Sequence, residues 1–405
     1  MKFSVINMLI ALTLVLFSCQ SEKAKDPVKP VESETQEKNA ESVSITFDIQ
    51  KPIADSSFNF DIEIPTTGRY KVILEGTACD SCQVWLEDYR NNQDDRTYDI
   101  TGKLLPLEGS ASVDGSPLAQ GSHAMRINVM GSFSPSSLRF DLMQDHLVTE
   151  SFMKQNMEGE NWKLVWSDEF DSQGLPDSTK WSYNVGNWGW GNNEPQYYTM
   201  ARLENARQED GNLVIEARKN DMGQSWTSAR LTTAGKVSFT YGKIEFRAKV
   251  PEGRGTWAAG WMLGDSYTDE LSWPYCGEID ILECVGYEIN DTSGAGLNHA
   301  TCHTRSYYFK QGNQIGAEIA IDSMNTKFHT YAIECDEKGI HGFLDGKKYY
   351  TYDKTADELE WPFNNPQNII LNLAVGGGWG GLKGIDPNYD SHQFIVDYVR
   401  VYERE

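Results

Sequence analysis

The sequence predicts an all-β protein built from two β-sandwiches, a smaller one followed by a larger jelly roll. Glycine and aromatic residues are abundant, with 35 Gly, 19 Tyr, 16 Phe and 12 Trp among 405 residues. This composition suits short strands joined by tight turns. Segments with helical periodicity are scarce, whereas alternating segments punctuated by Gly and Pro recur along the chain. At roughly 100 to 200 residues per domain, the chain has room for two or three domains.

The charge balance is strongly acidic and excludes one class of function. The chain has 36 Lys and Arg against 59 Asp and Glu, which gives a formal net charge of -23 at pH 7. A protein that binds nucleic acid by releasing counterions from phosphates needs a basic surface. Nucleic acid is therefore not an expected partner, and we expect a monomer.

The N-terminus is typical of an exported protein. Lys2 precedes the apolar run Phe3 to Phe17, which is too short to span a bilayer comfortably, so residues 1–18 fit a signal peptide. The stretch Leu16-Phe17-Ser18-Cys19 resembles the lipobox of bacterial lipoproteins. We therefore expect Cys19 to carry lipids that hold the protein on the outer membrane or the cell surface of a bacterium. An ordinary secretory signal peptide with a chance cysteine is the alternative.

A linker and a first globular part follow the signal peptide. Residues 19–42 are rich in Lys, Glu, Ser, Pro and Gln and lack aromatic residues, which predicts a flexible linker. Residues 43–150 alternate with period two, as in Tyr70-Lys71-Val72-Ile73-Leu74, and predict a β-sandwich. Its position is typical of a carbohydrate-binding module, and a spacer role is equally open. Sugar binding would need exposed aromatic residues such as Trp85 or Tyr89 on one surface.

Six cysteines follow Cys19, and two of them form the pattern Cys79-Asp80-Ser81-Cys82. An exported protein can oxidise such a close pair, although the same spacing also occurs in redox motifs and as half of a zinc site. The sequence contains no second C-x-x-C and no nearby histidine to complete a zinc site. We therefore expect a disulfide or free thiols.

The second globular part covers residues 160–405 and follows a short polar joint near Met153 to Asn161. Strand signals continue almost throughout, as in Leu213 to Ala217, Lys243 to Val250 and Phe394 to Tyr402. Many strands separated by Gly-rich turns predict two packed antiparallel sheets, the jelly-roll arrangement.

The segment Gly277 to Glu283 is the richest in chemistry. On a regular strand Glu278 and Asp280 share one face, while Glu283 falls on the opposite face. A β-bulge at Ile281-Leu282 would shift the register by one residue. All three carboxylates would then line one surface.

The two glutamates of this strand suit a retaining glycosidase. Their Cα atoms would lie roughly 13 Å apart at about 3.3 Å per strand step, and long side chains can close that gap to the roughly 5.5 Å between the carboxyl groups of retaining enzymes. Three neighbouring carboxylates repel one another, which should raise the pKa of at least one of them unless a metal or protons intervene. A general acid needs such a raised pKa to keep its proton near neutral pH. On spacing alone, an ordinary acidic strand is the alternative.

The pattern Glu278-x-Asp280-x-x-Glu283 resembles the bulged signature of glycoside hydrolase family 16, and the likeness covers about Trp162 to Tyr402. Further similar stretches are Trp166 to Phe170, Asn192 to Thr199, Tyr241 to Glu245, Gly260 to Leu263, Trp273 to Glu278, Asn372 to Gly377 and Asp397 to Tyr402. Within the family, His299 to Thr304 and Gly378 to Gly381 are most similar to laminarinases. The resemblance implies a concanavalin-like jelly roll with an open glycan cleft. It also implies retaining endo-hydrolysis of 1,3-β-glucan by double displacement.

Two stretches depart from the family pattern. Trp257-Ala258-Ala259-Gly260-Trp261 stands where many relatives have Trp-Pro-Ala-Phe-Trp, and Asp386 to Asp390 differs from the Phe-Pro-containing ending of many laminarinases. These departures concern fine substrate preference rather than the chemistry.

The resemblance also implies roles for individual residues. Glu278 would be the nucleophile, Glu283 the acid/base, and Asp280 the group between them that hydrogen-bonds and tunes the pair. The implied substrate-binding residues are Asn193, Arg230, Trp257, Trp261, His299, His303 and Trp379. The tryptophans offer flat apolar faces to sugar rings, and His303 could hydrogen-bond sugar hydroxyls or Glu283. For each of these residues the alternative is a purely structural role in the core or in a loop.

By the same resemblance, Glu169, the Gly211 carbonyl and Asp397 correspond to a structural calcium site far from the cleft. Oxygen ligands from distant segments suit a hard cation that ties the chain ends together. Asp397 capping its own strand without a metal is the alternative. No cofactor is expected for catalysis.

Two rival functions stay open. One is a hydrolase of the same family that cleaves mixed-linkage glucan or a marine galactan. A sulfated galactan would call for a basic cleft, so the acidic chain favours a neutral glucan. The other rival is a glycan-binding surface protein without turnover, which the presence of both glutamates disfavours for the C-terminal part.

Overall fold

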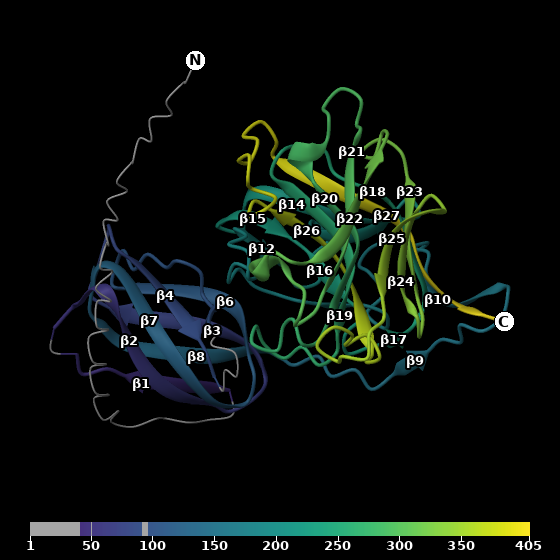
Figure 1. The fold of residues 1–405 in the computed structure, drawn as a ribbon. Coiled ribbons are helices and arrows are strands. Elements are labelled where there is room, and N and C mark those ends of the chain that lie inside the picture. The colour runs from purple at the N-terminus through teal and green to yellow at the C-terminus, as the bar shows by residue number, and fades with distance from the viewer. Residues whose placement is uncertain (1–40, 50, 91–95) are drawn as a thin grey trace, which may run out of the picture.

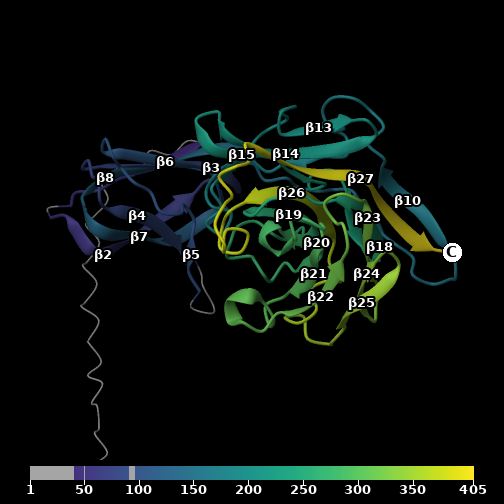
Figure 2. The same ribbon diagram turned by 90° about the horizontal axis from the view of Figure 1, so that it is seen from above.

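The computed structural model describes residues 41–49, 51–90 and 96–405, and these form two β-sandwiches that lie side by side (Figures 1 and 2). The predicted fold class is confirmed. The predicted signal peptide, Cys19 and nearly all of the predicted linker lie outside the described residues. Among the described residues, no helix has the length and apolar character needed to cross a membrane.

The N-terminal sandwich consists, within the described residues, of two four-stranded sheets. One sheet has the order β1-β8-β3-β6, with β1 (Ser42–Thr46), β3 (Gly68–Gly76), β6 (Ser110–Leu118) and β8 (Pro135–Asp145). The other has the order β2-β7-β4-β5, with β2 (Ile53–Ile64), β4 (Gln83–Asp88), β5 (Tyr98–Asp99) and β7 (Gly121–Phe133).

The core of this sandwich follows the alternation of its strands. Tyr70, Val72 and Leu74 of β3 are fully buried and share one core with Met125 and Ile127 of β7. The residues between them reach the surface of the sheets, as period-two alternation requires. Cys79 and Cys82 form a disulfide, which confirms one of the two predicted states for this pair. The four other described cysteines, Cys276, Cys284, Cys302 and Cys335, are buried thiols.

The C-terminal sandwich consists, within the described part of the chain, of a ten-stranded outer sheet and a nine-stranded inner sheet. The outer sheet contains β10 (Trp162–Asp168), β12 (Gln196–Tyr198), β13 (Ala206–Glu209), β14 (Asn212–Asp221), β15 (Gln224–Ser228), β18 (Gly242–Lys249), β23 (His329–Cys335), β24 (Gly339–Leu344), β25 (Lys347–Asp353) and β27 (Ser391–Arg404). The inner sheet contains β9 (Phe152–Lys154), β11 (Ser182–Tyr183), β16 (Arg230–Thr232), β17 (Ser238–Thr240), β19 (Thr256–Gly264), β20 (Glu278–Val285), β21 (Gly296–His303), β22 (Ile315–Ile321) and β26 (Gln367–Val375).

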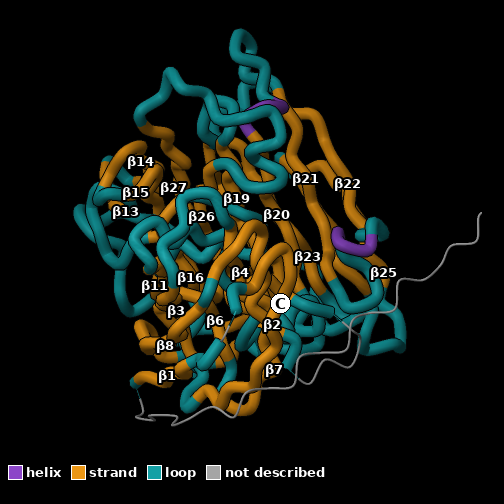
Figure 3. Tube along the Cα trace, turned by 90° about the vertical axis from the view of Figure 1, so that its left-hand side faces the viewer, coloured by secondary structure: helices purple, strands orange, loops and turns teal. Residues whose placement is uncertain are grey.

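The inner sheet has the order β11-β16-β26-β19-β20-β21-β22, and Figure 3 shows β19 to β22 running beside one another. Two short helical turns, η1 (Gly286–Glu288) and η2 (Phe309–Gln311), interrupt the strands of the described chain. Most neighbouring strands are antiparallel, as predicted, but β12 pairs with β15 and β9 pairs with β17 in parallel. Because β9 joins the inner sheet, this sandwich begins at Phe152 and includes part of the stretch predicted as a polar joint.

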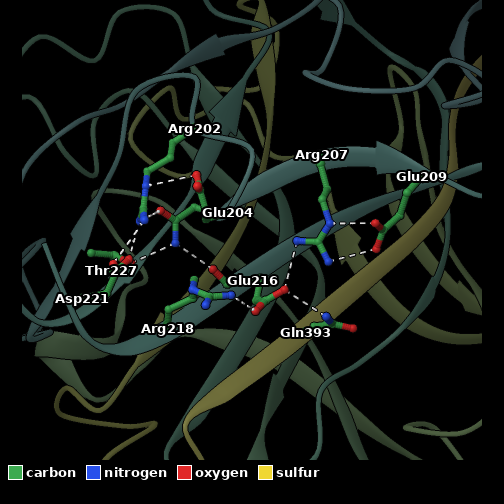
Figure 4. Close-up of polar contacts among 10 residues, drawn as sticks. Arg202, Glu204, Arg207, Glu209, Glu216, Arg218, Asp221, Thr227 and Gln393 are labelled. Atoms are coloured by element: carbon green, nitrogen blue, oxygen red, sulfur yellow. Dashed lines mark hydrogen bonds and ion pairs between the residues drawn. The ribbon is translucent and has the colours of Figure 1, made fainter.

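Arginine and carboxylate side chains tie together three strands of the outer sheet (Figure 4). Arg207 of β13 donates to Glu209 at 2.8 Å and to Glu216 of β14 at 2.9 Å. Gln393 of β27 and Arg218 also donate to Glu216, at 2.9 and 2.6 Å. Glu216 is buried but has several donors, which offsets the cost of desolvating its charge.

The two sandwiches meet with closely approaching backbones. The backbone N–H of Asp114 in β6 donates to the side-chain oxygen of Asn187 at 2.9 Å, and the backbone N–H of Asn187 donates to the carbonyl of Asp114 at 2.8 Å. A methyl group on Gly115 would clash with the carbonyl oxygen of Val185. Trp188 and Trp190, which follow in the chain, pack into the core cluster of the N-terminal sandwich. The contact between the two sandwiches is therefore a packed interface.

We predict that Gly115→Ala destabilises the protein by about 3 kcal/mol, because the new methyl group both clashes at this interface and strains a residue with φ of +90°. Gly121→Ala is the matched control, since Gly121 has φ of +124° in the same sandwich and open space where the methyl group would lie. Its cost should be about 1 kcal/mol of backbone strain alone. Thermal unfolding of both variants measures the difference, and equal shifts would contradict close packing at Gly115.

Candidate active site

A cleft lies over the face of the inner sheet that points away from the core. Alternate residues of the strands line it: Trp257, Ala259, Trp261 and Leu263 of β19, and Asn372 and Ala374 of β26. Residues between them, such as Ala258, Met262, Leu371 and Leu373, are buried in the core between the sheets. The period-two pattern of these strands thus separates cleft from core. The stretch Trp257 to Trp261 differs from the family pattern, and its Gly260 faces this core against the Phe246 ring. Gly260 therefore lies away from the cleft.

The predicted bulge in β20 is present. Asp280 pairs with Thr301 of β21 and Glu283 pairs with His299, so Ile281 and Leu282 together face a single residue of β21. Both Ile281 and Leu282 are buried in the core. Consequently Glu278, Asp280 and Glu283 all line the cleft, as the sequence predicted.

Two tryptophan side chains hold the glutamates. The indole N–H of Trp273 donates to Glu278 Oε2 at 3.0 Å, and the indole N–H of Trp257 donates to Glu283 Oε1 at 3.1 Å. Each carboxylate thus has one fixed oxygen, and its orientation is set before any ligand enters.

Burial shifts the ionisation of all three carboxyl groups. It raises the pKa of Glu278 to about 7, although the Trp273 hydrogen bond and the Arg230 charge oppose the rise. Burial raises the pKa of Glu283 to about 8, and repulsion from Glu278 adds to the effect. Burial, with repulsion from Glu283 and Glu278, holds the pKa of Asp280 well above its ordinary range. Glu278 therefore ionises before Glu283 as pH rises, and Glu283 can keep its proton near neutral pH.

His303 lies beside the carboxylates, opposite Glu278 in the pairing of β20 with β21. Its Nε2 is 3.4 Å from Asp280 Oδ2 and 3.8 Å from Glu278 Oε1. Sugar hydroxyls or Glu283 are the hydrogen-bond partners expected for His303 from the sequence, but the ring lies next to Asp280 and Glu278 instead of Glu283. Burial lowers the pKa of His303 to about 4, which keeps the ring neutral at neutral pH. A neutral imidazole leaves the raised pKa values of its neighbours in place.

Arg230 is stacked between two indole rings. Its guanidinium carbon lies 4.9 Å from the centre of the Trp190 ring and 4.7 Å from that of Trp261. Arg69 of the N-terminal sandwich lies over Trp190 at 5.0 Å. The indole N–H of Trp261 donates to Asn372 at 2.8 Å. One face of Trp261 is thus covered by Arg230, and the stack connects the cleft with the N-terminal sandwich.

Trp379 packs between Trp257 and His299. The Trp379 ring meets Trp257 edge to face at 5.2 Å and His299 at 5.0 Å. His299 Nε2 lies 2.7 Å from Glu288 Oε2. Trp379 is therefore adjacent to the cleft through its contact with Trp257, and His299 is adjacent to Trp379. Neither residue is among those that line the cleft.

The loop that carries Asn193 reaches the cleft through its neighbours. Asn192 and Glu194 line the cleft, whereas Asn193 adopts a left-handed backbone conformation with φ of 57° between them. Burial raises the pKa of Glu194 to about 7. Asn193 itself is not among the residues that line the cleft, and its contact with substrate stays a prediction.

Several other cleft residues were not singled out from the sequence: Trp188, Trp190, Gly191, Asn192, Glu194, Tyr267, Glu270, Trp273, Phe309, Lys310 and Asn372. Trp273, Asn372 and the residues around Asn192 lie in stretches similar to the family, so that resemblance could have found them. Tyr267, Glu270 and Lys310 lie in segments between strands, where no periodic pattern gives a signal.

The residues of the predicted calcium site are engaged with arginines. Glu169 accepts hydrogen bonds from Arg400 at 3.0 and 2.7 Å, and Asp397 pairs with Arg247. Gly211 lies in the turn between β13 and β14. Because both carboxylates are neutralised by guanidinium groups, this arrangement does not fit a calcium ion unless the arginines move aside.

The site defines the class of protein. Two buried glutamates with raised pKa values lie on one bulged strand in a cleft lined by aromatic residues. Glycoside hydrolases use such a pair of carboxyl groups, one ionised and one protonated, as their catalytic groups.

Comparison with known proteins identifies the family. Residues 193–400 match the family model described as glycosyl hydrolases family 16, and the chain belongs to this family. A β-glucanase from Rhodothermus marinus is 50% identical over 250 residues, covering 60% of this chain and 85% of that protein. A glucan endo-1,3-β-glucosidase from Cryptopygus antarcticus is 36% identical over 259 residues, covering 59% of this chain and 91% of that protein. The crystal structure of the laminarinase from Rhodothermus marinus aligns with a TM-score of 0.56 and 49% identity, covering 60% of this chain and 98% of that one.

We predict that Glu278→Gln stabilises the protein at pH 8.5 by on the order of 2 kcal/mol. The folded state holds the Glu278 proton more tightly than the unfolded state does, so stability is lost as pH rises from about 4.5, the ordinary value, through about 7. Glutamine removes this loss and keeps an acceptor for Trp273. At pH 4 the two proteins should have the same melting temperature. Glu358→Gln, which changes an exposed carboxyl, should leave the melting temperature unchanged at both pH values, and a similar gain in this control would refute the explanation.

Proposed function

We propose that the protein is a retaining endo-hydrolase of 1,3-β-glucan. The observation that carries the proposal is the bulge at Ile281-Leu282, which brings Glu278 and Glu283 to one surface with pKa values of about 7 and 8. The printed names of the relatives, a β-glucanase and a glucan endo-1,3-β-glucosidase, support the substrate.

In the first step, an oxygen of ionised Glu278 forms a bond to the anomeric carbon while the glycosidic carbon–oxygen bond breaks. Glu283 gives its proton to the departing oxygen. Its raised pKa keeps this proton available near neutral pH, and the Trp257 hydrogen bond fixes its other oxygen. The product of this step is a glycosyl ester of Glu278.

In the second step, Glu283 is ionised and takes a proton from a water molecule. The water oxygen bonds to the anomeric carbon, and the ester bond to Glu278 breaks, which returns both residues to their starting states. Two inversions leave the β configuration of the sugar unchanged. Asp280 lies next to both Glu278 and neutral His303, and burial with repulsion from the two glutamates holds its pKa well above the ordinary range, so it can respond to the change in charge on Glu278.

The charge of the cleft bears on the rival substrates. Its lining contains two cationic side chains, Arg230 and Lys310, and five carboxyl groups: Glu194, Glu270, Glu278, Asp280 and Glu283. Burial raises the pKa of all five carboxyl groups, so they offset the two cations only in part, and the lining lacks the strongly basic character that recognition of a sulfated galactan calls for. A neutral glucan carries no such penalty, whether 1,3-linked or mixed-linkage.

We predict that laminarin releases reducing ends faster than lichenan, agarose or carrageenan when all four are compared under the same conditions. Proton NMR of the laminarin reaction should show the β anomer first, because double displacement retains configuration. If the α anomer appears first, the mechanism is wrong. If agarose or carrageenan is the best substrate, the proposed substrate class is wrong, and if no glycan is cleaved, the non-catalytic rival is favoured.

We also propose that the protein is a bacterial lipoprotein anchored through Cys19, on the basis of the Leu16 to Cys19 stretch. We predict that Cys19→Ala moves the protein from the membrane fraction to the soluble fraction, while its activity on laminarin stays unchanged because the linker separates anchor and cleft. Immunoblots of both fractions give the measurement. Membrane retention of this variant would mean that another segment holds the protein.

Three expectations stay predictions. Calcium at Glu169 and Asp397 would have to displace Arg400 and Arg247, and the protein is expected to be a monomer. Sugar binding by the N-terminal sandwich rests on Trp85 and Tyr89, which are half-buried and have Lys103 and Arg126 over their rings.

A further inference from the structure

Residues 265–277 connect β19 to β20 and form part of the cleft. Tyr267, Glu270 and Trp273 of this connection line the cleft, and the Tyr267 hydroxyl donates to Glu270 at 2.7 Å. The connection ends directly before Glu278, and its Trp273 donates the indole hydrogen bond to that residue. Its conformation therefore decides where the donor to Glu278 lies.

The N-terminal sandwich holds this connection from behind. Arg96 donates from one guanidinium nitrogen to the carbonyl of Trp273 at 2.6 Å and from the other to the carbonyl of Leu271 at 3.0 Å. The Tyr98 hydroxyl donates to the same Trp273 carbonyl at 3.1 Å. Arg90 forms an ion pair with buried Asp269 at 2.9 Å.

Apolar packing accompanies these polar contacts. Tyr98 is 3% exposed and shares a buried cluster with Leu271, Trp273 and Tyr308 of the C-terminal sandwich. The Lys310 ammonium lies 4.5 Å from the centre of the Tyr98 ring and 5.7 Å from that of Trp273. A backbone carbonyl with two donors, next to a packed ring, leaves the Trp273 side chain little freedom.

We propose that Arg96 and Tyr98 are positioning residues for the reaction at Glu278, acting through the backbone and the indole N–H of Trp273. The N-terminal sandwich is then a working part of the catalytic site, beyond any role as a sugar-binding or spacer domain. This inference rests on the proposed function, in which Glu278 is the nucleophile.

The physical link is the charge of Glu278. A hydrogen bond from Trp273 stabilises the ionised carboxylate more than the protonated one, so it holds down a pKa that burial raises. The other charged or titratable groups near Glu278 are Arg230 of β16, Glu270 and Cys276 of the connection, Asp280 and Glu283 of β20, and Cys302 and His303 of β21. Variants at Arg96 and Tyr98 leave all of these in place.

The test compares Tyr98→Phe, Arg96→Gln and the double variant with the full-length wild type. Phenylalanine keeps the ring beneath Lys310 and removes only the hydroxyl. Arg139→Gln is the matched control, since Arg139 lies in the same sandwich, pairs with Asp141 and is half exposed. The measurements are kcat and KM on laminarin from pH 4 to pH 9, with thermal unfolding to confirm that each variant is folded.

In the double variant, we expect the acid limb of the kcat/KM profile to move up by about one pH unit. Activity at pH 5 would then fall about tenfold, with KM and the alkaline limb little changed. Arg139→Gln should match the wild type. A profile that keeps its shape while activity falls with the folded fraction would overturn the proposal, because it would show a merely structural contact. An unchanged profile at full activity would overturn it as well.

A second measurement does not depend on catalysis. The indole N–H resonance of Trp273, assigned with Trp273→Phe, should titrate with Glu278 in NMR spectra of the ¹⁵N-labelled protein. Its midpoint should rise by about one pH unit in the double variant, and an unmoved midpoint would overturn the proposal. Absence of hydrolysis by the wild type, with a shifted indole midpoint, would instead refute the proposed function and leave the positioning link established.

Discussion

The extra residue in β20 is the constraint on which the rest of the site depends. Without the bulge at Ile281-Leu282, Glu283 would point into the core between the sheets, where an unpaired carboxyl is costly. With it, Ile281 and Leu282 both enter the core and Glu283 joins Glu278 over the cleft. The same crowding and burial raise the pKa values of both glutamates, so one local irregularity supplies the acid, the nucleophile and their spacing.

The N-terminal sandwich adds a second constraint, which is electrostatic. The chain carries a large excess of negative charge, yet cations gather where the two sandwiches meet. Arg69 is buried over Trp190, and burial lowers its pKa to about 10. Arg230 also lies over the Trp190 ring and opposes the rise in the pKa of Glu278. The order of rings and cations from Arg69 to Trp261 thus brings positive charge to a cleft crowded with carboxyl groups.

The sequence was informative where strand periodicity applies and uninformative between the strands. The resemblance to the family implied that Trp257 and Trp261 belong to the cleft, and alternation required the bulge that β20 contains if the three carboxylates were to share one face. The sequence could not show that Tyr98 contacts Trp273, because that contact joins segments about 175 residues apart. Nor could it show that Glu169 pairs with Arg400, since this depends on the pairing of β10 with β27. Periodicity reports which face a residue occupies, but not which distant segment covers that face.

The assignment of Glu278 as nucleophile and Glu283 as acid/base is tested most directly by chemical rescue. Glu278→Ala and Glu283→Ala are each incubated with an aryl β-glucoside of a 1,3-linked oligosaccharide and sodium azide, and the anomeric configuration of the glycosyl azide is read by NMR. Azide replaces the missing nucleophile in the first variant, so the product should be the α-glycosyl azide. In the second variant azide attacks the glycosyl ester of Glu278, so the product should be the β-glycosyl azide. The reverse pair of configurations, or the same one from both variants, would contradict the assignment.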